Sequence, residues 1–210
     1  MTYQWISKEN PLILASASPR RKRLLEQVGL PFRMVPGHVD ENQSAPKPSF
    51  HARLLAEAKA RAACRILKNH WTLGADTIVV LGDAVLGKPQ DDQEAEAMLS
   101  ALSGKEHEVI TAFSILNPDG GVGHAQEVST RVRMKPLHMS EIKAYIATGE
   151  PFGKAGSYAI QGIGAFMVEA IQGSYSNVVG LPLCALIQAL LETGAIERFP
   201  LSGGDAAYGS

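Results

Sequence analysis

The segment SASPRR (16–21) combines a serine-rich turn with two adjacent arginines. Ser18 has the side chain of a helix N-cap and Pro19 suits a first helical turn, so a helix is expected to begin here with Arg20 and Arg21 in that turn. A helix N-terminus presents free N–H groups and a partial positive charge, which bind phosphate but disfavour nearby cations. The two arginines therefore indicate a bound anion. The alternative is a surface helix with solvated arginines and an ordinary serine cap.

An acidic residue and a threonine lie inside the apolar run TLGADTIVVL (72–81). The run predicts a strand that is interrupted at Gly74-Ala75-Asp76. A carboxylate in a core is unfavourable unless it is paired or coordinates a cation. Asp76, followed by Thr77, is therefore a candidate metal ligand or general base beside a cleft. The alternative is an aspartate at a bulge, hydrogen-bonded to the backbone.

Three other charged residues carry weaker signals. Lys88 lies in a Gly-Lys-Pro turn, Lys59 is one of several charges on an expected helix, and Glu41 follows Asp40 in a polar loop. The two carboxylates could supply oxygen ligands to a metal ion. Taken alone, each of these residues is more typical of a solvated surface charge.

Small residues are concentrated in two later segments, 153–164 and 173–182. They allow a ligand to approach the backbone closely. Within the first segment, Gln161 has an amide that both donates and accepts hydrogen bonds, as recognition of a nucleobase requires. In the second, Asn177 is a candidate helix cap and Gly180 a point of close approach. The alternative is that the glycines serve tight turns only.

Several common catalytic motifs are missing from the sequence. The six histidines have no ligand spacing, and neither HExxH nor a paired CxxC occurs, which argues against a zinc site. GxxxxGK[ST] and GxSxG are missing too, so neither a P-loop nor a nucleophile elbow is expected. Ser16 has no evident histidine partner for a hydrolase triad.

The hydrophobic pattern predicts the elements that position these residues. Strands are expected at 11–16, 31–37, 72–81, 84–88, 107–116, 124–135 and 165–171. Helices are expected at 19–28, 49–69, 91–104, 140–149 (capped by Ser140) and 183–193. Alternating strands and helices indicate an α/β protein, and the paired strands in the middle indicate a mixed sheet. The apolar stripe expected on the helix 49–69 consists of Leu54, Leu55, Ala58, Ala62, Ile66 and Leu67.

The composition, 45% hydrophobic and 20% charged over 210 residues, is that of a soluble globular protein with a substantial core. A formal net charge of -1 argues against a nucleic-acid binder, although it permits a local cluster of cations. Cys64 and Cys184 lie in apolar stretches and are expected to be reduced core residues. No signal peptide or membrane span is evident, so a cytoplasmic protein without a membrane partner is expected.

The order of the motifs is more informative than any one of them. The segments SASPRR, GADTIVV, LGKP, SGKEHEVITA, EPFGKAGSYAIQG and GSYSNVVGLPL together resemble the Maf family over residues 11–193. The resemblance implies the fold of inosine-triphosphate pyrophosphatases and Ham1 proteins: a mixed-sheet α/β domain, here residues 1–198, in two lobes with a cleft. The Gly-, Ala- and Ser-rich tail 199–210 is expected to be disordered. A homodimer is the family expectation.

The resemblance also implies an activity: hydrolysis of a nucleoside triphosphate to the monophosphate and pyrophosphate, with Mg²⁺ or a similar ion such as Mn²⁺ or Co²⁺. Asp76 would activate water or hold the metal ion, and Glu41 would help to hold it. A divalent ion with arginines and lysines would neutralise the pyrophosphate leaving group. The residues implied to bind the triphosphate are Ser16, Arg20, Arg21, Lys59 and Lys88.

Three positions bear on the choice of substrate. Arg20, Thr77 and Gln161 are similar to the branch of the family active on dTTP, UTP and modified pyrimidine nucleotides. The branch active on 7-methyl-GTP tends to have Trp, Gln and Glu there. One departure from the family pattern is Gly153, since Asp is common before the lysine at this point.

Two other functions stay open on the sequence. The family is associated with septum inhibition, so one alternative is a non-enzymatic regulator of cell division that binds a partner protein or nucleic acid. The near-neutral net charge argues against nucleic acid. The second alternative is a nucleotide phosphatase, which would release orthophosphate in place of pyrophosphate.

Overall fold

The computed structural model describes residues 3–37, 39 and 48–201, so Glu41 and nearly all of the predicted tail lie outside the described residues. Its strands are β1 (Leu12–Leu14), β2 (Phe32–Met34), β3 (Thr72–Leu81), β4 (Ala84–Leu86), β5 (Glu106–Leu116), β6 (Val122–Met134) and β7 (Val168–Gln172). They form one sheet in the order β2-β1-β3-β5-β6-β7, with β4 paired to β3. The first three strands run parallel and the others antiparallel to their neighbours. The predicted α/β class with a mixed sheet is confirmed.

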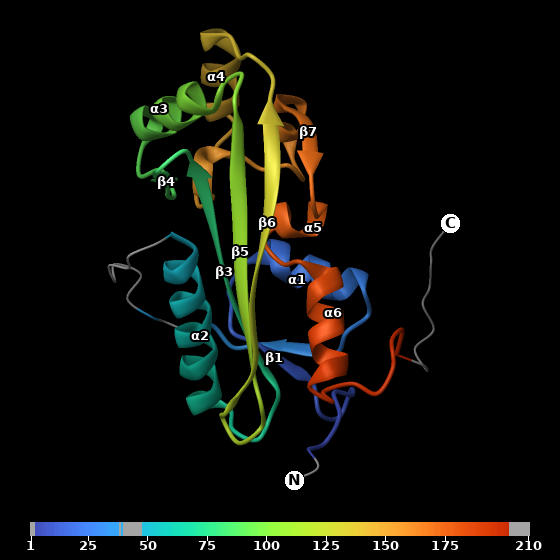
Figure 1. Cartoon of the computed structure of the whole chain (residues 1–210). Coiled ribbons are helices and arrows are strands. Elements are labelled where there is room, and N and C mark those ends of the chain that lie inside the picture. Colours follow the sequence, from blue (N-terminus) through green and yellow to red (C-terminus); the bar gives the residue numbers. More distant parts are fainter. Residues whose placement is uncertain (1–2, 38, 40–47, 202–210) are drawn as a thin grey trace.

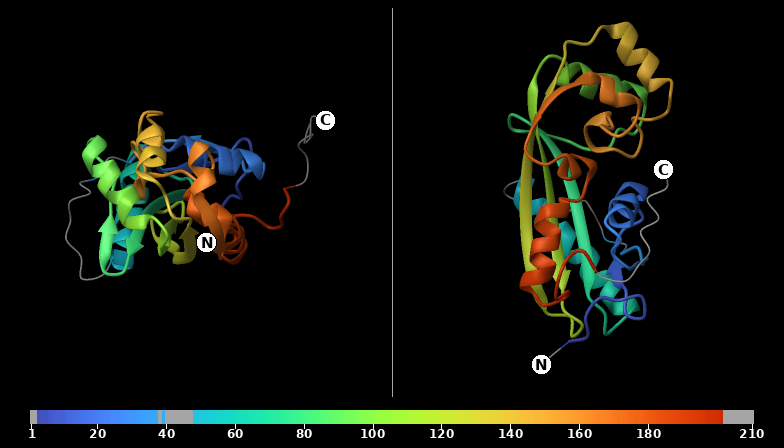
Figure 2. Two further views of the ribbon diagram at one scale, coloured as in Figure 1. Left: turned by 90° about the horizontal axis from the view of Figure 1, so that it is seen from above. Right: turned by 90° about the vertical axis from the view of Figure 1, so that its right-hand side faces the viewer.

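Six α-helices of the described chain flank this sheet: α1 (Pro19–Gln27), α2 (Pro48–Ile66), α3 (Asp92–Leu102), α4 (Met139–Ile146), α5 (Tyr175–Val179) and α6 (Leu183–Glu192). Figure 1 shows β3, β5 and β6 running along the length of the molecule, with α2 on one side and α1 and α6 on the other. The side view in Figure 2 shows α3 and α4 gathered at one end of these long strands. None of the helices within the described ranges is long and apolar enough to cross a bilayer.

The two faces of β3 pack against different helices, because successive side chains of a strand point to opposite sides. Leu73 and Ala75 belong to a large apolar cluster with residues of α1 and α6. Ile78 packs instead with Ala52 and Ala56 of α2. A second large cluster lies farther along the strands, where Val79 contacts residues of α3 and α4. Two apolar clusters therefore share one face of the same long sheet.

Gly74 determines how closely α2 approaches β3. A Cβ at this position would lie 2.1 Å from the carbonyl oxygen of Ala56 and 2.9 Å from the Cβ of Ala60. The strand runs without a break from Thr72 to Leu81, so the predicted interruption at Gly74-Ala75-Asp76 was wrong. The glycine makes room for a helix backbone and does not end the strand.

The stripe predicted on α2 was also partly wrong. Leu54 and Ile66 are 38% and 68% exposed. The buried face consists mainly of small residues, namely Ala52, Leu55, Ala56, Ala60 and Ala63. Because alanines have short side chains, this face brings the helix axis close to the sheet, in agreement with the space that Gly74 leaves.

Several other boundaries differ from the predictions. α4 begins at Met139, two residues earlier than a Ser140 cap would give, because the Glu141 carboxylate accepts the His138 N–H at 2.8 Å. Residues 163–167 form the short 3₁₀ helix η2 (Ile163–Met167), where part of a strand was expected. α5 was not predicted, and its N-cap is Ser174, whose hydroxyl accepts the Asn177 N–H at 3.3 Å.

The cysteines are unlinked, as predicted, but they are not core residues. Cys184 is exposed and Cys64 is half-buried. The apolar runs around them mark helices whose other faces are buried. The arrangement of residues 1–198 as one domain in two lobes stays a prediction.

Candidate active site

A cleft opens where β3 has no neighbouring strand. β1 pairs with β3 only at Thr72 and Leu73, and β4 pairs with it only from Val79 onward. Between these points, this edge of β3 has no strand partner among the described residues. The cleft there has a volume of about 420 Å³ and is also lined by residues 15–21, 153–155, 158–161 and 178–180. It lies beyond the carboxyl end of β1, a usual ligand position in α/β sheets.

The structure brings together every predicted site residue that it describes. These residues all line the cleft: Ser16, Arg20, Arg21, Lys59, Asp76, Thr77, Lys88 and Gln161. Glu41 lies outside the described residues, so nothing is said of its place. The roles of these residues in binding and catalysis stay predictions.

Asp76 lies on the α2 face of β3 and is paired with a lysine. Lys59 Nζ donates to Asp76 Oδ1 at 2.7 Å, and each side chain is 13% exposed. The partner of Asp76 is therefore a lysine side chain, and not the backbone as in the alternative of an aspartate at a bulge. Since an unpaired carboxylate at this depth is strongly unfavourable, Lys59 is what allows a charged Asp76 in the cleft.

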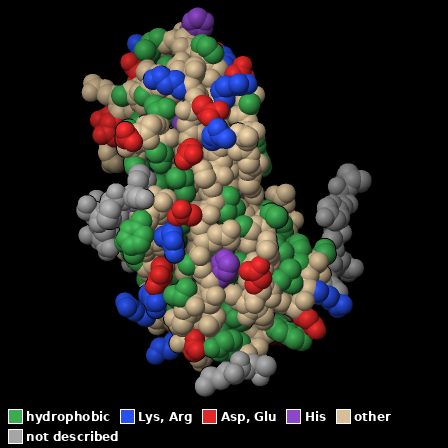
Figure 3. Space-filling view, viewed as in Figure 1, with side chains coloured by type: hydrophobic (Ala, Val, Ile, Leu, Met, Phe, Trp, Pro, Cys, Tyr) green, Lys and Arg blue, Asp and Glu red, His purple; other side chains and the backbone are tan. Residues whose placement is uncertain are grey.

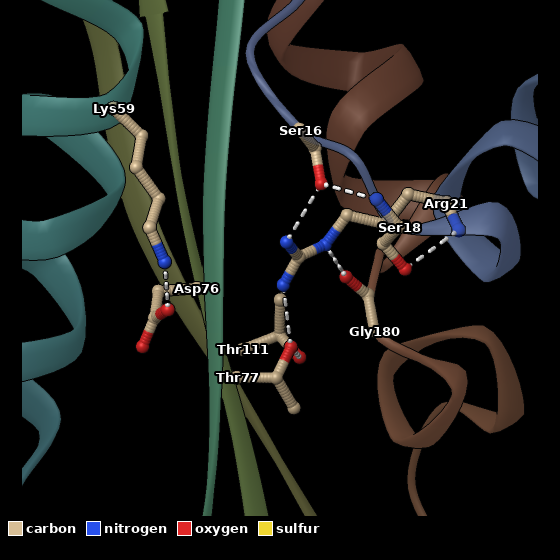
Figure 4. A network of polar contacts seen from close by, with 8 residues as sticks. All are labelled: Ser16, Ser18, Arg21, Lys59, Asp76, Thr77, Thr111 and Gly180. Carbon is tan, nitrogen blue, oxygen red and sulfur yellow. Dashed lines mark hydrogen bonds and ion pairs between the residues drawn. The ribbon is translucent and has the colours of Figure 1, made fainter. Parts of the chain in front are cut away.

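Thr77 points to the other face of β3, toward Arg21, as Figure 4 shows. Arg21 donates to three acceptors: Nε to the Gly180 carbonyl at 2.8 Å, Nη1 to Ser16 Oγ at 3.2 Å and Nη2 to Thr77 Oγ1 at 3.0 Å. Ser16 Oγ also accepts the Ser18 N–H at 3.2 Å. The rigid fork of the guanidinium therefore joins the turn after β1 to β3 and to the end of α5.

A buried network continues behind Thr77. Its hydroxyl lies 3.0 Å from Thr111 Oγ1, which donates to the Asn177 carbonyl at 3.0 Å. Asn177 Nδ2 in turn donates to the Val109 carbonyl at 2.9 Å and to Thr130 Oγ1 at 3.0 Å. Thr111 and Asn177 are fully buried, so the network fixes the floor of the cleft from within the core.

Thr111 was not identified from the sequence, and Asn177 is not the helix cap that was expected, because Ser174 caps α5. Thr111 is a polar residue inside the apolar strand β5, which is the same signal that drew attention to Asp76. That signal could have identified Thr111 as a residue with a buried partner. It could not have named the partner, because Asn177 lies 66 positions away.

Arg20 and Lys154 form the cationic part of the cleft. The pKa of Arg20 is lowered by burial. The pKa of Lys154 is lowered by burial and then by the positive charge of Arg20. The Arg20 guanidinium has no hydrogen bond or ion pair with the other described residues. Two partly buried cations that repel each other are stabilised when an anion binds between them.

The charges that line the cleft are strongly unbalanced. Among the described residues, five are cationic and one is a carboxylate: Arg20, Arg21, Lys59, Lys88 and Lys154 against Asp76. The Gly156 N–H donates to the Gly87 carbonyl at 3.0 Å, which brings the turn that carries Lys88 beside the segment that carries Lys154. On the face drawn in Figure 3, acidic and basic side chains are interspersed. The excess of cations thus belongs to the cleft of a chain whose net charge is -1.

The described residues contain no cluster of three or more acidic, histidine or cysteine side chains that could enclose a metal ion. Asp76 nevertheless fits Mg²⁺, which proteins that bind phosphates hold by one or two carboxylates together with phosphate oxygens and water. The hydrogen bond from Lys59 uses Oδ1 of Asp76. The second carboxylate oxygen of Asp76, a residue that lines the cleft, is of the hard type that Mg²⁺ prefers.

The fold and the cleft define an α/β protein with a site for a polyanionic ligand. The family model "Maf-like protein" matches residues 11–193, so the chain belongs to the Maf family.

Several known proteins are similar to this chain. A "dTTP/UTP pyrophosphatase" of Geobacter sp. (strain M21) is 48% identical over 190 residues, covering 90% of this chain and 98% of the relative. One of Geotalea uraniireducens (strain Rf4) is 51% identical over 187 residues, covering 89% and 96%. Among solved structures, the Ham1 protein of Staphylococcus aureus is similar over 60% of this chain and 72% of its own, with 14% identity and a TM-score of 0.43.

Proposed function

We propose that this chain hydrolyses nucleoside triphosphates, namely dTTP, UTP and modified pyrimidine nucleotides, to the monophosphate and pyrophosphate. The observation that carries the proposal is the cleft itself, whose lining among the described residues has five cationic side chains and one carboxylate. A nucleoside triphosphate fits this lining, because its short triphosphate group carries several negative charges. Relatives about half identical over nine-tenths of the chain have this activity in their names.

The triphosphate is bound mainly by Arg20, Lys88 and Lys154. Arg20 and Lys154 repel each other in the free protein, and a polyphosphate removes this repulsion. Arg21 is held by Ser16, Thr77 and Gly180, so it contributes a fixed charge and shapes the turn. Interactions that strengthen as pyrophosphate departs lower the barrier more than uniform binding does.

Asp76 is the group that acts on water. The water oxygen forms a bond to the α-phosphorus while the α–β anhydride bond breaks, and the electron pair leaves with pyrophosphate. The proton of the water passes to Asp76 or, through it, to solvent. Lys59 Nζ lies 2.7 Å from Asp76 Oδ1 and holds the carboxylate in place for this task.

A divalent ion, Mg²⁺ or alternatively Mn²⁺ or Co²⁺, would be held by Asp76 and by phosphate oxygens and would neutralise charge on the leaving group. Glu41 is proposed as its second protein ligand. The base is recognised by Gln161, whose amide can match the donor and acceptor edge of uracil or thymine. A cytoplasmic homodimer that binds neither nucleic acid nor membranes completes the proposal.

The test is a hydrolysis panel over dTTP, UTP, CTP, GTP and 7-methyl-GTP, with pyrophosphate detected separately from orthophosphate. The expected result is pyrophosphate from dTTP and UTP, lost in Asp76→Asn and on removal of divalent ions with EDTA. Orthophosphate as the first product would overturn the chemistry. Turnover of purine nucleotides alone would overturn the choice of substrate. No turnover of any triphosphate would favour a non-enzymatic regulator of cell division.

A further inference from the structure

The segment that carries Gln161 is held on both sides by side chains from α4 and the turn after it. Glu150 Oε1 accepts the Ile163 N–H at 3.0 Å, and Oε2 accepts the Gly164 N–H at 2.8 Å. On the other side, the Tyr145 hydroxyl accepts the Ala159 N–H at 3.1 Å. These bonds fix the backbone two residues before Gln161 and two and three residues after it.

The two holding groups are themselves connected. The Tyr145 hydroxyl donates to the Glu150 carboxylate, which contributes to a raised pKa of Tyr145 after the larger effect of burial. Burial alone would raise the pKa of Glu150, but hydrogen bonds from Gly164, Tyr145 and Ile163 outweigh it and the net pKa is lowered. Glu150 is therefore ionised at neutral pH, and its carboxylate accepts all three hydrogen bonds at once.

Gly162 is fitted to the same carboxylate. A Cβ on Gly162 would lie 1.7 Å from Glu150 Oε1, so a larger residue could not occupy this position beside Glu150. Gln161 therefore lies between the Ala159 amide, which Tyr145 holds, and the segment from Gly162 to Gly164, which Glu150 holds. Tyr145 is 2% exposed and packs in the apolar cluster of α3 and α4, which anchors the arrangement to the core.

Gln161 itself has little to hold it. Its side chain is exposed at the cleft, and no hydrogen bond from it to the described residues is recorded. The place of its amide is therefore set by its backbone, and its backbone is set by Glu150 and Tyr145. A base-recognising amide has to be held to a fraction of an ångström for its hydrogen bonds to discriminate between similar bases.

We propose that Glu150 and Tyr145 are positioning residues that set the selectivity of the cleft for uracil and thymine over cytosine by fixing the backbone around Gln161. The inference rests on the proposed function, because it assigns Gln161 to the base. It predicts a loss of discrimination rather than a loss of chemistry, since neither residue lines the cleft.

The experiment compares UTP with CTP, which differ only in the base edge. In Glu150→Gln the amide nitrogen replaces one of the two accepting oxygens and cannot accept the N–H bound there. The UTP-to-CTP ratio of kcat/KM is expected to fall about tenfold, while kcat/KM for CTP stays within about threefold. Tyr145→Phe is expected to lower the ratio less, because it leaves the Glu150 bonds to Ile163 and Gly164 in place. The matched control is Glu169→Gln, which changes an exposed carboxylate paired with Arg133 and should leave the ratio unchanged.

A double-mutant cycle with Gln161→Ala separates positioning from general loosening. If Glu150 acts through Gln161, Glu150→Gln has no further effect on the ratio in the Gln161→Ala background. The proposal is overturned if Glu150→Gln still lowers the UTP-to-CTP ratio in the Gln161→Ala background. It is also overturned if Glu150→Gln speeds hydrogen exchange at the Ile163 and Gly164 amides but leaves the ratio unchanged.

A binding measurement distinguishes failure of this inference from failure of the proposed function. Calorimetric affinities for UMP and CMP report base selectivity without turnover. Preference for UMP in a chain that hydrolyses no triphosphate would sink the proposed activity and leave the role of Glu150 to be decided by the same variants. Equal affinities of the native chain for UMP and CMP would overturn the inference directly.

Discussion

The two faces of β3 at the cleft are built in opposite ways, although they belong to adjacent residues. On the α2 face, the ion pair with Lys59 is the only bond that the Asp76 side chain makes to the described residues. On the α1 face, Thr77 belongs to a network of neutral side chains that connects the Arg21 guanidinium to Asn177. The first arrangement leaves a carboxylate oxygen for substrate, water or metal. The second uses the hydroxyls of Thr77 and Thr111 in bonds within the protein.

This difference separates chemistry from shape. A group that reacts has to keep an atom available, whereas a group that shapes a site is most useful when its bonds are satisfied. The neighbouring arginines differ in the same way. The Arg21 guanidinium donates to three acceptors, whereas the Arg20 guanidinium makes no hydrogen bond to the described residues. Arg20 is accordingly the arginine expected to meet the triphosphate.

The largest effect is expected from Asp76→Asn, which keeps the shape of the side chain and removes its charge. The amide is a poor base and a poor metal ligand, so kcat/KM for UTP should fall about 1,000-fold or more. Steady-state release of pyrophosphate measures this. Glu57→Gln, the same change at a half-exposed carboxylate of α2 paired with Arg61, should leave activity intact. Activity within about threefold of the native chain would remove Asp76 from the chemistry.

The two arginines provide the second comparison. Arg21→Lys keeps the charge but cannot reach Ser16, Thr77 and Gly180 together, so kcat/KM should fall about 100-fold with a lower melting temperature. Arg20→Lys should lower kcat/KM about tenfold, mainly through KM, and leave the melting temperature unchanged. Equal melting temperatures for both variants would contradict the division between a shaping and a binding arginine.

Local signals in the sequence were sufficient for much of the fold. Ser18 caps α1, and Gly29, with φ of +66°, follows its end as predicted, because capping depends on a few neighbouring residues. The cleft residues could be predicted as a set only through the order of the motifs, which the resemblance to the Maf family supplied. Their roles stay predictions.

The failures concern contacts between distant residues. Gly74 was interpreted as a break because its partner, the backbone of α2 at Ala56, is placed by tertiary packing. The pairing of Thr111 with Asn177 is likewise invisible to any local pattern. No periodicity in the sequence states which buried polar groups will meet.

Gly74→Ala should disturb the close packing of α2 on β3, on the face that carries the Lys59–Asp76 pair. The new Cβ would require the Ala56 backbone to move, and Lys59, less than a turn farther along α2, would move with it. We expect a loss of about 1–3 kcal/mol of stability and about a tenfold fall in kcat/KM. Thermal unfolding and pyrophosphate release measure the two effects. Gly87→Ala, with open space around its Cβ, should leave the melting temperature unchanged.

If Gly74→Ala matches the native chain in both measurements, close packing of α2 does not position Lys59. A lower melting temperature with native activity would separate the two effects and show that the Lys59–Asp76 pair adjusts to a displaced helix. The expected result is that both fall together, because the pair spans the same contact that the new Cβ disturbs.

The smallest effect is expected from Thr111→Val, which keeps the volume of the side chain and removes its hydroxyl. Thr77 then loses its buried partner, and Arg21 is held less firmly, so kcat/KM should fall about threefold. The Asn177 carbonyl still accepts the Gly180 N–H at 2.9 Å, so α5 keeps its end. The matched control on the same strand is Ser114→Ala, which removes a buried hydroxyl that has no hydrogen-bond partner among the described residues.

Ser114→Ala should leave activity unchanged and keep or raise the melting temperature, because it removes an unsatisfied polar group from the core. Thr111→Val should differ from it in activity even if the two variants melt at similar temperatures. Identical activities would mean that the hydroxyl behind Thr77 serves packing alone. Arg21 would then be held by Ser16, Thr77 and Gly180 without help from the Thr111 hydroxyl.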